Sequence, residues 1–318
     1  MIQKVKRKLR HMTCQMHEKR SLSRALAIEK NEWGGVQPIE LTLLLLAHSL
    51  EKGMGIENPR KGFGREKAAS LIECLRKCED KSSYAYRESL SVLGAYIEFS
   101  EKSGSVDQSL ISAYEELSVQ VSEGDKYPAG YELYTPQDIY DNIHTDGVQR
   151  FLCSRHSVRA FENEPISEKT MESILSMAAT APSACNRQPI KVYWTSDRDK
   201  VAAIDALIPG NKGFEGQIPN WAIITADRGM FGNTECLQWY VNGGIYASHF
   251  VLACHANHIG SCIFQLPIAY ESIDQIRQVA HIPNNYAIIC AVGFGKPKTQ
   301  VKRLMASRKP IGDYAEIF

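Results

Sequence analysis

The spacing of apolar residues changes part-way along this chain of 318 residues, and that change limits the folds open to it. Up to about residue 123 the apolar positions recur every three to four residues, which predicts amphipathic helices. No alternating pattern typical of a strand interrupts this half. The predicted helices span 41–50, 67–78, 84–100 and 109–121. The first half therefore predicts an all-α domain.

The second half has a different pattern, which begins after a connector containing Pro128 and Gly130. Ser167 and Asp197 fit the N-caps of two helices, and the first of these ends before Pro182. Residues 235–258 read as one long helix that is apolar on most faces, so we expect it to be buried. Short apolar runs, typical of strands, occupy 191–195, 222–226, 261–264 and 287–294. We predict an α+β domain with a mixed sheet over 147–318, preceded by a helical domain and connector over 1–146.

Composition narrows the class of protein. A net charge of +1 gives no general attraction to nucleic acid, and we expect no nucleic-acid partner. The nine scattered cysteines favour free thiols in a reducing compartment, and their spacing favours no metal site. No run approaches the ~18 apolar residues of a membrane-spanning helix. We expect a cytoplasmic protein whose basic, amphipathic N-terminal helix packs on its own domain or a dimer partner, a reading favoured over contact with a membrane surface.

Two short segments carry most of the functional signal. The run RHSVRAF begins at Arg155 and places Ser157 between two guanidinium groups, an arrangement suited to phosphate oxygens. The run APSACNRQP begins at Ala181 and gathers hydroxyl, amide and backbone donors that suit the carbonyls and ring nitrogens of a heterocycle. Together they predict a pocket for a phosphorylated, flat, redox-active ring.

This pair of motifs resembles the FMN-dependent nitroreductase family, and the resemblance covers about residues 149–318. It implies an α-β-α sandwich and an obligate homodimer with FMN at the interface. It also implies that NAD(P)H is the electron donor. In the family the first motif holds the phosphate and ribityl chain, and the second approaches the flavin of the other subunit. The implied cofactor contacts are Arg155, His156, Ser157 and Arg159, followed by Pro182, Ser183, Ala184, Asn186 and Gln188.

Two further segments resemble parts of the same family. The stretch GSCIFQLP from Gly260 is similar to the segment that offers a backbone amide to flavin N5, which implies contacts from Cys262, Ile263, Phe264 and Gln265. Many relatives have a glycine at the place of Gln265, so this side chain is also a candidate substrate contact. The run RKPIGDY resembles the C-terminal basic motif and implies that Arg308 reaches the phosphate.

Several of these residues also have a purely structural interpretation. Arg159 is favoured as a flavin ligand over an ion pair with Glu162 or Glu164, whereas Arg187 is equally expected in the pocket or exposed. Apolar neighbours favour an inert, buried thiol at Cys262. The histidines near the end of the long helix lack the HExxH glutamate, so we assign no metal ligand.

The helical half contains one dense segment, HSLEKGMGIENPRKGFG, which begins at His48. His48, Glu51 and Lys52 share a helix face, and basic residues follow in a Pro/Gly-punctuated loop. The segment fits either an anion site or substrate lid, with His48 and Lys52 as substrate contacts, or a helix-end salt bridge. It resembles the helical extension of nitroreductase-like proteins linked to surface polysaccharide synthesis.

The sequence thus predicts an enzyme that passes electrons from NAD(P)H through FMN to a small electron-poor acceptor, such as a nitroaromatic, quinone or enone-like metabolite. The flavin N5 would carry the chemistry, so no catalytic side chain is named. Two other functions stay open. One is a flavin-binding interaction protein without turnover, and the other is a flavin-free protein that binds a phosphorylated ligand.

Overall fold

The computed structural model describes residues 38–105, 107–232, 235, 237–264, 266 and 270–318, together with Met12 and Met16. The N-terminal amphipathic helix expected from the sequence lies almost wholly outside these residues, as do Cys14, Cys236 and Gln265. Within the described part, no helix is long and apolar enough to cross a membrane.

The first half is helical, as its periodicity predicts. Its helices are α2 (Ile39–Met54), α3 (Arg65–Lys77), α4 (Tyr84–Lys102) and α5 (Gln108–Ser118). The side chain of Ser83 caps α4 by accepting from the backbone N–H of Tyr86, and Asp107 caps α5. The apolar faces of the helices meet in one core that includes Leu50, Leu71 and Leu90. This half therefore buries a core of its own.

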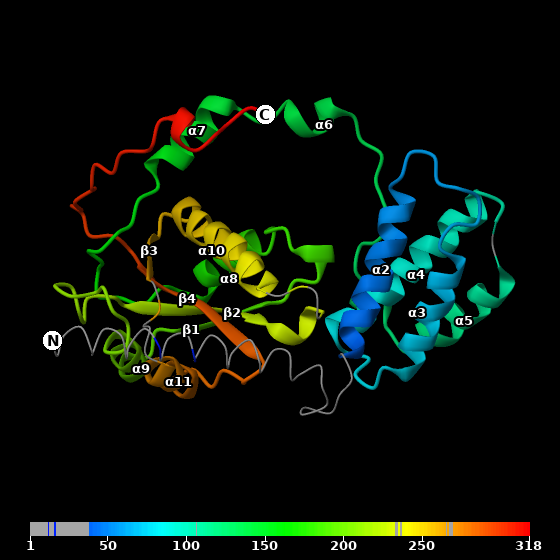
Figure 1. The fold of residues 1–318 in the computed structure, drawn as a ribbon, viewed down its shortest axis with the longest axis horizontal. Coiled ribbons are helices and arrows are strands. Elements are labelled where there is room, and N and C mark those ends of the chain that lie inside the picture. Colours follow the sequence, from blue (N-terminus) through cyan, green and yellow to red (C-terminus); the bar gives the residue numbers. More distant parts are fainter. Residues whose placement is uncertain are drawn as a thin grey trace.

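An exposed connector follows and leads into the second half. It contains the short 3-10 helix η1 (Glu123–Asp125), α6 (Pro136–Tyr140) and α7 (Thr145–Ser154). Thr135 and Asp138 form a capping box at the start of α6. In Figure 1 the connector crosses over the molecule from the helical domain, and the C-terminal tail runs beside α7.

The second half is built around a sheet of four strands, β1 (Ile190–Thr195), β2 (Asn220–Asp227), β3 (Gly260–Phe264) and β4 (Tyr286–Gly295). All four strand predictions are confirmed. The strand order is β1-β2-β4-β3, and every neighbouring pair is antiparallel. The expected mixed sheet is therefore wrong for these strands, and the parallel pairing seen in the described chain is an isolated bridge between Ser157 and Ser261.

Helices cover both faces of the sheet, which confirms the predicted α+β sandwich (Figure 1). Helices α8 (Glu168–Ala178) and α10 (Gln238–Ala256) enclose one core with β2 and β4, and it includes Ile174, Phe250 and Phe294. On the opposite face, α9 (Arg198–Asp205) and α11 (Tyr270–Val279) enclose a second core that contains Trp221 and Ile276. The predicted caps hold, since Ser167 accepts from Thr170 and Asp197 accepts from two N–H groups.

Helix α10 is only partly buried, in contrast to the sequence-based expectation. A Cβ added to Gly243 would lie 2.5 Å from Ile289 on β4, so the close approach inferred from this glycine is real and involves the sheet. Gly244 faces open space, and the same side of the helix exposes Tyr240 and Val241. The long helix therefore presents one apolar face that the single chain leaves uncovered.

The helical half meets the sandwich at a small junction. Helix α2 contacts the 3-10 helices η2 (Ala184–Asn186) and η3 (Arg228–Met230). From α4, the Tyr84 hydroxyl accepts a hydrogen bond of 2.6 Å from Nε2 of Gln188. The junction thus falls on the second of the two sequence motifs.

Candidate functional site

The first motif lies beside the edge strand β3. It leaves the C-terminal end of α7 in extended conformation at Arg155. The backbone N–H of Val158 then donates to the carbonyl of Ser261 at 3.0 Å. The side chain of Val158 fills the space above Gly260, where a Cβ would come within 2.8 Å. The sequence therefore fixes this segment to the sheet between its two arginines.

Both guanidinium groups of the motif lack a carboxylate partner among the described residues. Arg159 makes only a 3.5 Å contact with the carbonyl of Ser157. Glu164, one of its expected ion-pair partners, is instead bound by Lys296 at 3.0 Å. The Arg159 guanidinium therefore stays available to a ligand in the described chain.

The charge of these arginines reaches Cys262 on β3. Burial raises the pKa of the Cys262 thiol, while Arg159 and Arg155 partly offset that rise. The side chain is 5% exposed and belongs to the core. This agrees with the inert thiol expected from its apolar neighbours.

His156 places an unpaired nitrogen in the same region. Its Nδ1 lies 3.0 Å from the carbonyl of Ser154, which requires Nδ1–H to donate and leaves Nε2 as an acceptor in the neutral ring. Nε2 is buried and has no partner. On α10, His255 lies 2.8 Å from the Ser154 hydroxyl and packs against Phe151. His255 thus steadies the turn into the motif.

The second motif forms a strained loop. Cys185, Asn186 and Gln188 all have φ between 48° and 50°, in the left-handed region that non-glycine residues rarely occupy. Such residues cost about 1–2 kcal/mol each and persist only where the surroundings enforce them. The Ser183 hydroxyl accepts from the N–H of Gln188 at 3.0 Å and closes the loop. Concentrated backbone strain of this kind is typical of ligand-binding loops.

Arg187 holds the loop in this strained conformation. The sequence-based expectations that it lies in the pocket or is exposed are both wrong. It is 1% exposed, so it is neither a surface residue nor free to reach a pocket. Its guanidinium binds both carboxylate oxygens of Glu235 at 2.6 and 2.8 Å and lies 4.9 Å from the ring centre of Phe231. It also donates to the carbonyls of Ala184 and Met230. The hydrogen bonds from Arg187 lower the pKa of Glu235, which keeps the pair ionised.

Two other elements hold the loop from outside. Asn242 of α10 accepts from the N–H of Ala184 at 2.8 Å, and Tyr84 of α4 holds Gln188. Asn242 is 4% exposed within an apolar helix, and a buried amide of this kind was the available sequence signal. Tyr84 had no such signal, because it lies 104 residues from its partner. Pro182 and Asn186 remain exposed on the loop.

The remaining cofactor candidates are less concentrated. The Ile263 side chain is 46% exposed, whereas Phe264 packs 5.0 Å from Trp221 in the core. The Phe264 side chain thus belongs to the core, and its backbone stays a candidate contact. Gln265 lies outside the described residues. Arg308 donates to the neighbouring carbonyls of Ala306 and Ser307.

A different tail residue approaches the first motif. Arg303 donates to the carbonyl of Cys153, at the end of α7, over 2.5 Å. Sequence reasoning missed Arg303 because it stands in no recognisable motif. It brings another guanidinium group to the segment that leads into Arg155.

The substrate candidates lie near an acidic pair, of which Glu88 is buried and Glu51 is half-buried. Glu51 of α2 and Glu88 of α4 face the side of the helical domain that carries Tyr84. Burial and the charge of Glu51 raise the pKa of Glu88 to about 7, and burial also raises the pKa of Glu51. His48 is half-buried near Glu51, whereas Lys52 is exposed and forms no ion pair with Glu51 in the described chain. Of the two basic candidates, it is the charge of His48 that partly offsets the rise in the pKa of Glu51 caused by burial.

The two motifs lie at opposite edges of the sheet. The first runs beside β3 and the second leads into β1, and these are the outer strands in the order β1-β2-β4-β3. Three strand spacings, or roughly 14 Å, separate these two outer strands, and the first motif lies beyond β3. In the described chain the two motifs are therefore separated by the width of the sheet.

Comparison with known proteins agrees with the motif assignment. Residues 152–212 match the model of the nitroreductase family. A protein of Archaeoglobus fulgidus, provisionally assigned as an NADH dehydrogenase/NAD(P)H nitroreductase, is 25% identical over 153 residues, which are 48% of this chain and 86% of the relative. An FMN reductase [NAD(P)H] of Bacillus subtilis is 26% identical over 80 residues, 25% of this chain and 32% of that protein.

Solved structures are also similar to about half of the chain. One is an FMN-dependent nitroreductase of Clostridium difficile, with 22% identity and a TM-score of 0.45. The match covers 52% of this chain and 96% of the other.

Proposed function

We propose that the C-terminal half of this chain is a nitroreductase-family domain and that the protein is an FMN-dependent oxidoreductase. It takes electrons from NAD(P)H and passes them to a small electron-poor acceptor. The observation that carries the proposal is the pair of half-sites, one cationic and one strained, at opposite edges of a single sheet.

The first half-site fits the phosphate end of FMN. Arg155 and Arg159 offer guanidinium groups that no described carboxylate neutralises, and the Ser157 hydroxyl lies between them. The buried, unpartnered Nε2 of His156 also calls for a polar neighbour that the single chain does not supply. A phosphate held by two guanidinium forks satisfies the charge of this region.

The second half-site fits the flavin ring. The strained loop leaves Pro182 and Asn186 exposed, while Arg187 and Asn242 fix its backbone from behind. A rigid loop with exposed donors can bind a flat heterocycle without losing much conformational entropy. FMN, when bound, supplies the hydride chemistry, and these side chains orient its ring.

We further propose that two chains combine to complete each site. The separation of the two motifs by the full width of the sheet suits a cofactor shared between protomers. Apolar side chains also remain uncovered on α10, on α7 and in the tail. These are Leu237, Tyr240, Val241, Val148, Leu152, Met305, Ile311 and Tyr314, each at least 43% exposed. Such a surface on a single chain is typical of a protein–protein interface.

The helical domain would then cover the acceptor side of the site. Its Tyr84 accepts a hydrogen bond from Gln188 in the strained loop of the second motif, and α2 contacts the same loop. The acidic pair Glu51 and Glu88 lies behind this contact, with His48 nearby. We propose that this face of the helical domain, including His48, selects the acceptor, with the domain boundary near residue 146.

The visible spectrum of the purified protein tests the proposal. We expect a flavin absorption band at about 450 nm that bleaches on anaerobic addition of NADH or NADPH. Arg155→Ala should weaken FMN retention by about tenfold or more, because a charge-assisted bidentate contact is lost. Arg198→Ala, at an exposed arginine on α9, is the matched control and should retain FMN.

Other outcomes distinguish the alternative functions. A yellow protein that nicotinamides do not bleach would indicate a flavin-binding interaction protein. Colourless protein that stays free of flavin in excess FMN would refute the proposal and favour a flavin-free binding protein. Equal FMN retention in Arg155→Ala and the control would remove the assigned role of Arg155.

A further inference from the structure

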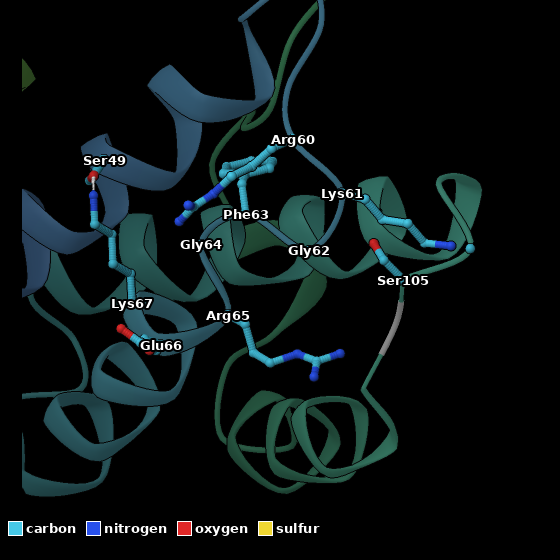
Figure 2. A pocket seen from close by; sticks show the side chains of 11 residues that line it. Ser49, Arg60, Lys61, Gly62, Phe63, Gly64, Arg65, Glu66, Lys67 and Ser105 are labelled. Carbon is cyan, nitrogen blue, oxygen red and sulfur yellow. Dashed lines mark hydrogen bonds between the residues drawn. The ribbon is translucent and has the colours of Figure 1, made fainter.

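A basic cavity in the helical domain lies apart from both motifs. It has a volume of about 730 Å³ and is formed by the loop between α2 and α3, the start of α3 and the turn after α4. Figure 2 shows the side chains that line it. Four are cationic and one is acidic, namely Arg60, Lys61, Arg65, Lys67 and Glu66, and Ser49 and Ser105 add hydroxyl groups.

The cations of this cavity are poorly neutralised. Arg65 lies 3.7 Å from Asp107, near the outer limit of an ion pair. Lys67 donates to the hydroxyl of Ser49. Within the part of the chain that the structure describes, no carboxylate pairs with Arg60 or Lys61. The cluster therefore carries an excess of positive charge that can attract an anion.

The position of the charges opposes the stability of α3. Arg65 and Lys67 stand in its first turn, where the helix dipole favours anions, and Glu66 alone is favourable. The N-cap, Gly64, offers no side-chain oxygen to the free N–H groups. An anion bound in the cavity would offset the repulsion between the cations and the helix dipole, and it could accept hydrogen bonds from the free N–H groups.

The loop that presents the cations is rigid. The Phe63 ring packs 5.6 Å from Tyr96 and equally close to Phe99, in edge-on contacts. The Tyr96 hydroxyl donates to the carbonyl of Phe63 at 2.5 Å. Gly53 leaves room for the Phe63 ring, since a Cβ there would lie 2.1 Å from it. The cations thus surround a preformed cavity, which lowers the entropic cost of binding.

We propose that this cavity binds a small soluble molecule that carries a phosphate or diphosphate group. Guanidinium and ammonium groups with nearby hydroxyls match the several oxygens of such a group. The volume lies in the range of ligand pockets and exceeds the need of a lone inorganic anion, so the ligand has a further body. This site is separate from the proposed flavin site and does not depend on it.

Titration with inorganic pyrophosphate, followed by calorimetry on the full-length FMN-saturated protein, tests the proposal. Arg60→Gln/Lys61→Gln should weaken binding about tenfold or more. The matched control, Lys77→Gln/Lys169→Gln, removes the same charge from exposed sites elsewhere and should bind as the wild type does. Hydrogen exchange should also show that pyrophosphate protects the amides of residues 60–67 in the wild type but not in the first variant.

Several results would overturn the proposal. They are absence of pyrophosphate binding to the wild type, equal binding to both double variants, or binding that only Arg155→Ala removes. Binding to phosphatidylglycerol vesicles through Arg60 and Lys61 without any response to pyrophosphate would also refute a soluble ligand. The same titration can be read on protein without flavin, so failure of the flavin proposal would leave this test intact. Circular dichroism checks that each variant is folded.

Discussion

Arg187 illustrates how one buried guanidinium group can determine a loop. It ties three left-handed residues to Glu235 and to two backbone carbonyls. No local pattern could have placed it inside, because Glu235 lies 48 residues away in the chain. The sequence predicted the neighbouring residues of the motif as cofactor contacts, but it did not predict that Arg187 fixes the conformation of their loop.

Arg187→Lys should therefore destabilise the protein. Lysine keeps the charge but cannot form the bidentate contact, so the half-buried carboxylate of Glu235 and two backbone carbonyls lose hydrogen bonds. We expect the free energy of unfolding to fall by about 2–4 kcal/mol, measured by urea denaturation. Arg198→Lys, at an exposed site, should change it little. Equal stability of the two variants would contradict the anchoring role.

Glu88 is a residue whose ionisation should weaken the fold. It is 7% exposed, and its pKa is raised to about 7 by burial and Glu51. The pKa of Glu88 is higher in the folded protein than in the unfolded chain, so the protonated carboxyl favours folding. This contribution to the free energy of unfolding is complete below about pH 4.5 and is lost as the pH rises through 7. In the wild type this effect should lower the free energy of unfolding by about 2–3 kcal/mol between pH 5 and 8, and Glu88→Gln should abolish that decrease. Denaturation across that range checks this, with exposed Glu98→Gln as the control.

At the scale of elements, the strands of the sandwich were readable because each is a short apolar run with turn residues beside it. Their pairing was not, since the order β1-β2-β4-β3 depends on connections far apart in the chain. Helix α10 shows the same division. Its glycines signalled close approach, but only the structure separates Gly243, which meets Ile289, from Gly244, which faces outward.

Gly243→Ala should destabilise the sandwich despite the better helix propensity of alanine. The new methyl group would overlap Ile289, and overpacking of this kind costs about 1–3 kcal/mol against a propensity gain of about 1 kcal/mol. The double variant Gly243→Ala/Ile289→Ala provides room for the methyl group. Thermal unfolding should show it to be more stable than the sum of the single effects. Strict additivity would exclude a steric cause.

At the scale of the whole molecule, the uncovered face of α10 should be an interface. Tyr240→Asp places a charge on this face, where the native ring is 43% exposed in the single chain. We expect sedimentation velocity to show a shift from dimer to monomer, accompanied by loss of FMN absorbance. Val119→Asp, at a position 87% exposed on the helical domain, should alter neither property. A wild-type protein that sediments as a monomer with full flavin would contradict the shared site.

The placement of the helical domain could not be predicted from the sequence. Its own core follows from its periodicity, but its docking depends on a few contacts such as that between Tyr84 and Gln188. The basic cavity is an intermediate case. Its charges stood out in the segment after His48, but the contacts of Phe63 that shape it did not.

The location of the motifs on opposite edges has a genetic consequence. A protomer damaged only in its phosphate-binding arginines and another damaged only in the loop before β1 would each be inactive alone. Co-expressed, they would pair at random, and every mixed pair would carry one wholly intact centre beside one doubly damaged centre. About a quarter of the wild-type activity should then return by intragenic complementation.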